Sequence, residues 1–232
     1  MENITFNSRE EFKKYIEEHQ VKRFGVGEDG YCVLLDNGLV IKCFHYDYYP
    51  EYVLQFKDVD TDTFIFAKSC ALVNGFAAGA FMQQAVGETV YDHKPVNQNF
   101  ITLGEHLDVL MKDTKLISEK GILIKDFKCS SLIYDDKRFR VVDTIRYESY
   151  PKSDLSIPNT REVMHQIYPF LLNEIMSYHE IRREYSFWGR LDRLEKPKEY
   201  FEEIKDRIEE VSGEKITTLA DANKVLSKVY KQ

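Results

Sequence analysis

The sequence predicts an α+β protein with a strand-rich first third and a mainly helical remainder. Asn-Gly pairs at 37–38 and 74–75 each separate two apolar runs of strand length. This pattern is the strongest short signal for a β-hairpin, because both residues tolerate a positive φ. After Gly87, apolar residues recur at the three- and four-residue spacing of amphipathic helices. The 232 residues suit one large domain or two small lobes that share a cleft.

We therefore predict a bilobal fold, with an antiparallel β-rich lobe at residues 1–86 and a mainly helical lobe at residues 87–232. The first lobe opens with a helix that begins at Ser8 and ends near residues 19–20, since Ser8 and Glu11 form a capping box. Two hairpins follow, and a fifth strand precedes the first of them. The hairpin strands are predicted at residues 31–35, 39–44, 70–73 and 76–83.

Four helices and three short strands are predicted in the second lobe. The helices show apolar stripes, and the short strands are apolar pieces with polar turns between them. The predicted helices cover residues 101–119, 159–178, 196–211 and 218–231, and the strands cover residues 122–124, 132–134 and 139–142.

Composition excludes several classes of function. The chain has 32 Lys and Arg against 39 Asp and Glu, so its net charge of −7 disfavours nucleic acid as a partner. No apolar run approaches the ~18 residues of a membrane span, and no secretory signal is visible, so we expect no membrane partner. The four cysteines form no Cys-x-x-Cys pair, and three lie in strand-like apolar runs, where reduced cysteine packs as a small hydrophobe. We therefore expect a cytoplasmic protein.

A glycine-rich segment is the first motif with chemical meaning. Gly25, Gly27 and Gly30 fit the pattern Gly-x-Gly-x-x-Gly. A dinucleotide-binding fold needs a helix directly after the third glycine, but here an apolar strand follows at 31–35. A glycine loop between two antiparallel strands is instead how protein kinases cover the phosphates of ATP. Glycines on their own also make ordinary turns.

Lys42 lies in the strand after the first hairpin, on the same face as Val40 and Phe44 by two-residue alternation. A lysine in such a strand either protects a sheet edge or lines a cleft where it pairs with phosphate. Its position one hairpin after the glycine loop resembles that of the lysine in the Val-Ala-Ile-Lys motif of protein kinases.

Residues 124–133 read Ile-Lys-Asp-Phe-Lys-Cys-Ser-Ser-Leu-Ile and resemble the catalytic loop of protein kinases, His-Arg-Asp-Leu-x-x-x-x-Asn. Asp126 occupies the position of the catalytic aspartate in this motif. Lys128 matches the lysine that Ser/Thr protein kinases carry two residues later, and Ser131 stands at the asparagine.

Residues 140–144, Arg-Val-Val-Asp-Thr, resemble the strand that leads to Asp-Phe-Gly, with Asp143 at the magnesium-binding aspartate. Taken singly, Asp126 and Asp143 are also typical of turns and caps. Their order and spacing, together with the glycine loop and Lys42, favour a resemblance to a small, divergent, bacterial-type protein kinase across residues 21–150.

The resemblance implies an ATP-dependent phosphotransferase that uses Mg²⁺ and transfers the γ-phosphoryl group to a hydroxyl of a protein or small molecule. Lys42 would hold the α- and β-phosphates, and Asp143 with Ser131 would hold Mg²⁺. Asp126 would accept or orient the acceptor hydroxyl, and Lys128 would neutralise the transferring group. The Lys42 ammonium and the Asp143 carboxylate are then expected to face one cleft.

The resemblance assigns further residues to nucleotide binding besides the glycine loop. Gln84 and Val86 would offer backbone groups to the adenine edge at a hinge between the lobes. Glu51, the first glutamate after Lys42, follows a proline that can open a short helix, and we nominate it as the ion-pair partner of Lys42. A solvent-facing acid in a first helical turn is the alternative for Glu51.

The sequence departs from the family in ways that keep two alternatives open. Ile-Lys at 124–125 replaces His-Arg, Ser131 replaces Asn, Thr-Ile at 144–145 replaces Phe-Gly, and no Ala-Pro-Glu follows. These changes favour a pseudokinase that binds nucleotide or a partner without turnover. The short stretch at 146–158 favours a small-molecule kinase of the same fold, which Lys128 opposes.

Overall fold

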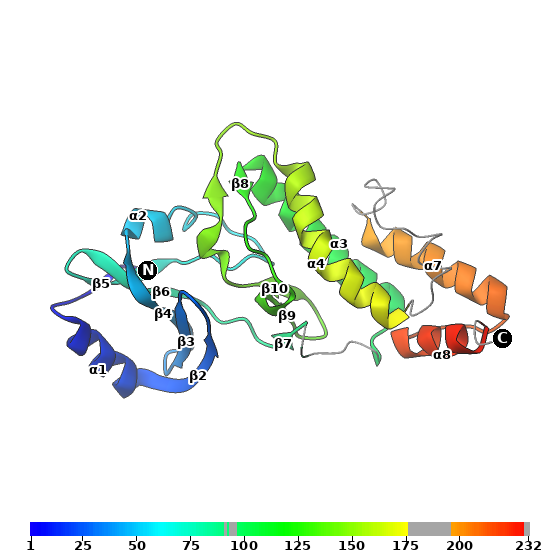
Figure 1. Ribbon diagram of the computed structural model, residues 1–232, viewed down its shortest axis with the longest axis horizontal. Coiled ribbons are helices and arrows are strands. Elements are labelled where there is room, and N and C mark those ends of the chain that lie inside the picture. Colours follow the sequence, from blue (N-terminus) through cyan, green and yellow to red (C-terminus); the bar gives the residue numbers. More distant parts are fainter. Residues whose placement is uncertain (91, 93–96, 176–195, 230–232) are drawn as a thin grey trace. The chain divides into compact units, whose positions relative to one another are not determined.

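The computed structural model describes residues 1–90, 92, 97–175 and 196–229 (Figure 1). The chain forms two compact units, Met1–Val86 with Val141–Arg146, and Gly87–Arg140 with Tyr147–Gln232. Strands and helices segregate along the chain, so the α+β class is confirmed. The placement of residues 141–146 with the second lobe was wrong. The amide of Val141 donates to Thr63 O and its carbonyl accepts from Ile65 N, at 2.8 and 2.9 Å, which joins this segment to the first unit.

The first unit is built on a six-stranded mixed sheet with the order β1-β5-β6-β4-β3-β2 (Figure 1). Every neighbouring pair is antiparallel except β1 and β5, which are parallel. Both Asn-Gly hairpins and the strand before them are confirmed, whereas β1 was not predicted. The strands are β1 (Ile4–Phe6), β2 (Gln20–Val26), β3 (Gly30–Leu35), β4 (Leu39–Tyr48), β5 (Ser69–Val73) and β6 (Phe76–Gln83).

A helix packs on each face of this sheet. The predicted first helix is confirmed as α1 (Arg9–His19), which Ser8 caps by accepting from the Glu11 amide, and which buries Phe12 and Ile16. These two side chains join an apolar cluster that includes Ile41. On the other face, the single turn of α2 (Pro50–Val53) contributes Val53 to a second cluster, which also contains Phe44 and, from the returning segment, Ile145.

The cysteines of the chain carry free thiols. Cys43 and Cys70 are buried in the two apolar clusters of the first unit, and burial raises the pKa of each thiol to about 12. A thiol with so high a pKa is a poor nucleophile, so both side chains act as small hydrophobic groups.

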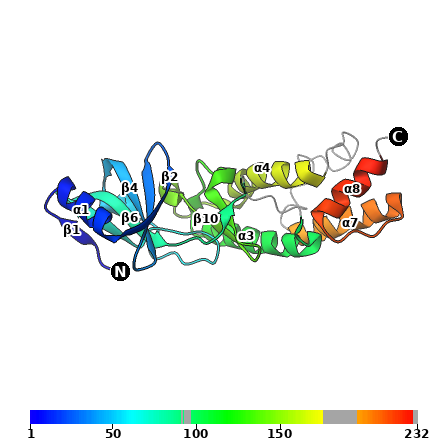
Figure 2. The ribbon, with the colours of Figure 1, turned by 90° about the horizontal axis from the view of Figure 1, so that it is seen from below.

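The second unit consists mainly of helices, with short strands at one end. α3 packs against α4 and α7, and α8 packs against both α4 and α7 (Figure 2). Gly104 of α3 permits this close approach, because a Cβ there would lie 2.8 Å from the Cα of Lys198. The helices are α3 (Phe100–Glu119), α4 (Ser156–Ile175), α7 (Pro197–Ser212) and α8 (Leu219–Val229), and the strands are β7 (Glu88–Thr89), β8 (Ile122–Leu123), β9 (Leu132–Tyr134), β10 (Phe139–Val141) and β11 (Glu148–Ser149).

The four predicted helices of this unit are confirmed in place, although α4 begins three residues before Asn159. The predicted ends at Tyr178 and Lys231 lie outside the described residues. Among the helices that are described, none has both the length and the apolar character needed to cross a membrane.

Candidate functional site

The glycine-rich segment forms the turn between β2 and β3, which pair antiparallel as expected. The turn is closed by a hydrogen bond from the Gly27 amide to the Gly30 carbonyl, at 2.8 Å. Gly25 has a φ of 63°, which favours glycine. Gly30 is required for a different reason, since a Cβ there would lie 1.9 Å from the Cys43 carbonyl oxygen on β4. The third glycine thus has a packing role whether or not phosphate binds.

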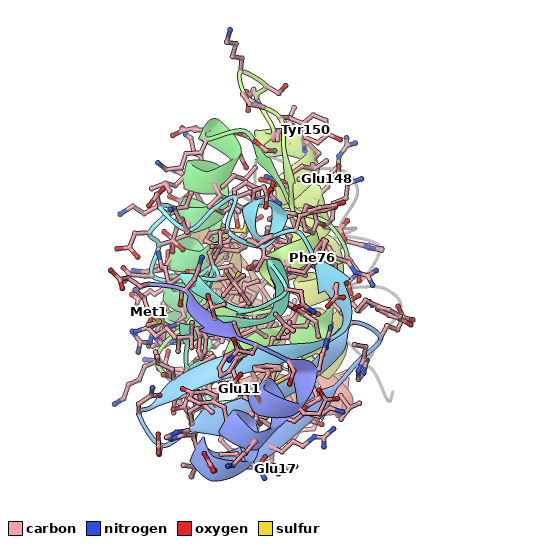
Figure 3. The ribbon with its side chains drawn as sticks, turned by 90° about the vertical axis from the view of Figure 1, so that its left-hand side faces the viewer. Met1, Glu11, Glu17, Phe76, Glu148 and Tyr150 are labelled. Atoms are coloured by element: carbon pink, nitrogen blue, oxygen red, sulfur yellow. The ribbon has the colours of Figure 1, made fainter. Side chains whose placement is uncertain are left out.

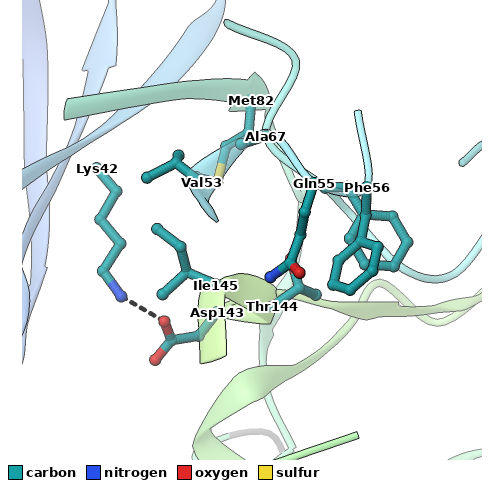
Figure 4. Close-up of a pocket in the computed structure, with 10 residues that line it drawn as sticks. Lys42, Val53, Gln55, Phe56, Ala67, Met82, Asp143, Thr144 and Ile145 are labelled. Atoms are coloured by element: carbon teal, nitrogen blue, oxygen red, sulfur yellow. Dashed lines mark hydrogen bonds and ion pairs between the residues drawn. The ribbon is translucent and has the colours of Figure 1, made fainter. Parts of the chain in front are cut away.

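Lys42 projects from β4 into the first unit, and its side chain is only 10% exposed. Its ammonium donates to the Asp143 carboxylate (Figure 4) and lies 3.9 Å from the carboxylate of Asp29. β4 lies between β3 and β6, so Lys42 does not protect a sheet edge and that alternative is wrong. The two groups that were expected to face each other, Lys42 and Asp143, are in direct contact.

Backbone contacts hold Asp143 in place. The preceding Val141 is bridged to Phe64, and the hydroxyl of Thr144 donates to the Ile65 carbonyl at 2.9 Å. Asp143 itself has a φ of 63°, a left-handed conformation that is uncommon for residues other than glycine. The contacts of Val141 and Thr144 hold the chain on either side of this residue.

A second acid–base pair, which the sequence did not predict, joins the glycine loop to this segment. Arg146 donates from Nη2 and Nε to the two carboxylate oxygens of Asp29, at 2.8 and 3.1 Å. The Tyr48 hydroxyl donates to the same carboxylate at 3.1 Å, and Glu28 lies 3.6 Å from the guanidinium. The bond from Arg146 lowers the pKa of Asp29, and Lys42 adds to this effect against the opposing effect of burial. The four side chains therefore form a row of alternating charge, which runs from Arg146 through Asp29 and Lys42 to Asp143.

A pocket opens beside Lys42 and Asp143 within the first unit (Figure 4). Its volume is about 350 Å³, including the part open to solvent. Apolar side chains from α2, β6 and the segment around residue 66 line most of it, Lys42 and Asp143 contribute charge, and Gln55 and Thr144 contribute uncharged polar groups. The lining residues are Lys42, Val53, Gln55, Phe56, Phe66, Ala67, Met82, Asp143, Thr144 and Ile145.

The nomination of Glu51 as the partner of Lys42 was wrong. Glu51 lies exposed in the first turn of α2, where an acid is favoured by the helix dipole. The ion pairs that the described structure gives Lys42 are with Asp143 and Asp29. The acids near Lys42 therefore come from the glycine loop and from the segment at Asp143, and not from α2.

Gln84 and Val86 follow the last ladder position of β6, where Gln83 pairs with Leu39. Gln84 is partly exposed, and Val86 is 62% exposed. Their backbone groups lie beyond the sheet ladder at the end of the first unit, and their contact with adenine stays a prediction.

The second unit holds the other expected catalytic residues. The Lys128 ammonium lies 3.0 Å from the Asp126 carboxylate, which is 38% exposed on its side chain. Asp126 has a φ of 54°, so both aspartates that the sequence singled out adopt the left-handed conformation. Ser131 ends a 3₁₀ turn, Cys129–Ser131, in which its amide donates to the Lys128 carbonyl. The residue is buried, at 7% exposure.

Asn159 fixes the stem of this loop from the first turn of α4. Its side chain is fully buried, accepts from the Ile124 amide at 2.8 Å, and donates to the Ile122 carbonyl and the Ser118 hydroxyl at 2.7 and 2.8 Å. The sequence indicated only a helix start here. An asparagine near a helix start is the only sequence feature that could have drawn attention to Asn159. It does not predict a hydrogen bond to Ile124, which lies 35 residues earlier.

Charged and aromatic residues flank the loop on its exposed side. Lys125 lies 3.8 Å from Glu148 on β11, and the Tyr150 hydroxyl donates to the same carboxylate at 2.7 Å (Figure 3). Since β11 pairs with β8, these contacts join the loop to the segment that follows Arg146.

The described residues contain no cluster of three or more His, Cys, Asp or Glu side chains suited to a metal ion. Mg²⁺ does not require such a cluster, because it is usually held by one or two protein oxygens together with water and substrate phosphate. Binding of Mg²⁺ by Asp143 and Ser131 stays a prediction.

Comparison with known proteins adds no family: no protein-family model matches the chain, and no curated protein matches it significantly.

Proposed function

We propose that the chain is an ATP-dependent phosphotransferase of bilobal, protein-kinase-like fold. The ion pair between Lys42 and Asp143 carries the proposal, because it joins two residues 101 positions apart that belong to two different sequence motifs. The glycine loop between β2 and β3, and the position of Lys42 on the following strand, also support the kinase-like fold.

The chemistry that these residues provide is that of in-line phosphoryl transfer, in which positioning and charge neutralisation do most of the work. Lys42 would hold the α- and β-phosphates, and Asp143 and Ser131 would hold Mg²⁺. When bound, the metal ion would neutralise phosphate charge. Asp126 would accept or orient the proton of the acceptor hydroxyl, and Lys128, paired with it, would stabilise charge on the transferring group.

A nucleotide-binding pseudokinase is the second candidate. It is favoured by Ser131 in place of Asn, which removes an amide oxygen from the metal site, and by Thr144, whose hydroxyl is already bonded to Ile65. For an active enzyme, the acceptor stays open between a protein and a small molecule. Lys128 favours a protein acceptor, and the few residues between β11 and α4 favour a small one.

Calorimetric titration of the full chain with Mg-ATP tests the proposal. We expect Lys42→Met to weaken binding by about 10- to 150-fold, because a charge-assisted hydrogen bond is worth about 1.5–3 kcal/mol. Lys14→Met is the matched control, since Lys14 is 74% exposed on α1 and pairs only loosely with Glu18. Equal affinity of folded Lys42→Met and wild type would reject the phosphate-holding role.

A further inference from the structure

Asp29 lies where two cationic groups converge inside the first unit. Its carboxylate receives two bonds from the Arg146 guanidinium and lies 3.9 Å from the Lys42 ammonium. The side chains of Asp29 and Lys42 are 14% and 10% exposed, so solvent screens this pair poorly, whereas the Arg146 side chain is 42% exposed and reachable from solution. The contact is built from three separate segments, which are the glycine loop, β4 and the segment after Asp143.

The geometry around Asp29 is that of an anion-binding site. The fork of an arginine guanidinium matches a carboxylate and a phosphate equally well, and a neighbouring lysine adds a point charge. Tyr48 donates a further hydrogen bond to the same carboxylate. An anion that approached Lys42 from solution would meet a carboxylate of like charge about 4 Å away from the ammonium.

We propose that Asp29 is an internal competitor for nucleotide phosphate, occupying the anion site formed by Lys42 and Arg146 until phosphate displaces it. The inference rests on the proposed function, since it takes nucleotide phosphate as the anion that displaces Asp29. The glycine loop then has two states. In one, Asp29 is bonded to Arg146. In the other, phosphate takes the place of Asp29 beside Arg146 and Lys42, while Lys42 keeps its contact with Asp143. The apparent affinity for nucleotide is reduced by the population of the first state.

The competition distinguishes this role from the opposite one, in which Asp29 orients Lys42 for binding. A competitor lowers the affinity for anions, so its removal strengthens binding. An orienting partner raises the affinity, so its removal weakens binding.

Titration of the full chain with Mg²⁺-free ADP and with inorganic pyrophosphate tests the proposal. We expect Asp29→Asn to bind both anions about tenfold more tightly than wild type, because one charge-assisted contact no longer has to be broken. Asp47→Asn is the matched control for net charge, since Asp47 pairs with Arg9 and is 55% exposed. It should change either affinity by less than about twofold.

Tyr48→Phe supplies a second test that retains every charge. It removes only the hydroxyl that donates to Asp29, so we expect a smaller gain in affinity than Asp29→Asn gives, and this variant decides the matter if Asp29→Asn does not fold. Unchanged or weaker binding of pyrophosphate by the folded variants overturns the proposal.

The two anions separate this inference from the proposed function. Tighter pyrophosphate binding by Asp29→Asn, with no ADP binding by any variant, supports Asp29 as a competitor for phosphate groups and rejects nucleotide as the anion that displaces it. ADP binding that weakens in Asp29→Asn rejects the competitor and leaves the nucleotide site in place. If no variant binds either anion, both proposals are wrong.

Discussion

Replacing Asn159 by alanine removes three hydrogen bonds from the stem of the loop that carries Asp126. Each bond is 2.7–2.8 Å long, and the side chain is fully buried. At about 1 kcal/mol for each bond, the free energy of unfolding should fall by about 3 kcal/mol. The Ile124 amide loses its partner, which adds to the cost.

Two controls calibrate this loss. Ser118→Ala removes the hydroxyl that accepts from Asn159 and donates to the Thr114 carbonyl, so it should cost about 1–2 kcal/mol. Thr160→Ala alters the neighbouring position of α4 and should change stability by less than about 0.5 kcal/mol.

Urea unfolding followed by circular dichroism gives the global effect of these variants, and amide hydrogen exchange at Ile124 gives the local one. We expect Asn159→Ala to exchange the Ile124 amide much faster than wild type, while amides of the β4–β6 ladder keep their protection. Unchanged protection of Ile124 in a folded Asn159→Ala protein would refute the assignment of Asn159 as the residue that positions this loop.

Two further predictions concern the first unit. Gly30→Ala should lower the free energy of unfolding by about 3 kcal/mol or more, because the added Cβ meets the Cys43 carbonyl, whereas Gly27→Ala, which adds a Cβ in open space, should be tolerated in the same urea titration. The lowered pKa of Asp29 means that its contribution to stability is fully present above the unfolded value of ~3.9 and is lost as the pH falls through the lower folded value. The difference in unfolding free energy between wild type and Asp29→Asn should therefore shrink below about pH 4, and a difference that stays constant to pH 2 would contradict this contribution.

Local patterns predicted most of the secondary structure correctly. The Asn-Gly turns and the Ser8 cap are encoded within a few residues, so the hairpins and α1 could be placed from sequence. β1 could not, because three residues are too few to show alternation, and the strand is specified by its parallel pairing with β5, more than 60 residues later.

The candidate site was predicted only where residue order carried information. The contact between Lys42 and Asp143 followed from the order of the motifs. The pairing of Asp29 with Arg146 did not, since it depends on the segment around Asp143 joining the first unit through contacts of Val141, Thr144 and Ile145 that no local pattern indicates. The prediction that Glu51 pairs with Lys42 was wrong because a proline such as Pro50 shows where a helix begins but not which residues the helix faces.

Transfer of labelled γ-phosphate from Mg-ATP tests the central proposal most directly, with the full chain assayed for labelling of itself, of protein acceptors and of small hydroxyl compounds. We expect Asp126→Asn to keep near-normal Mg-ATP affinity and to lose transfer by about 10²–10⁴-fold, because its carboxylate acts on the acceptor hydroxyl. Asp143→Asn should lose both affinity and transfer, since its carboxylate would hold the metal that bridges the phosphates. Asp47→Asn should match wild type. Binding without transfer in the wild-type chain would favour the pseudokinase, and transfer by Asp126→Asn at the wild-type rate would contradict the assigned catalytic loop.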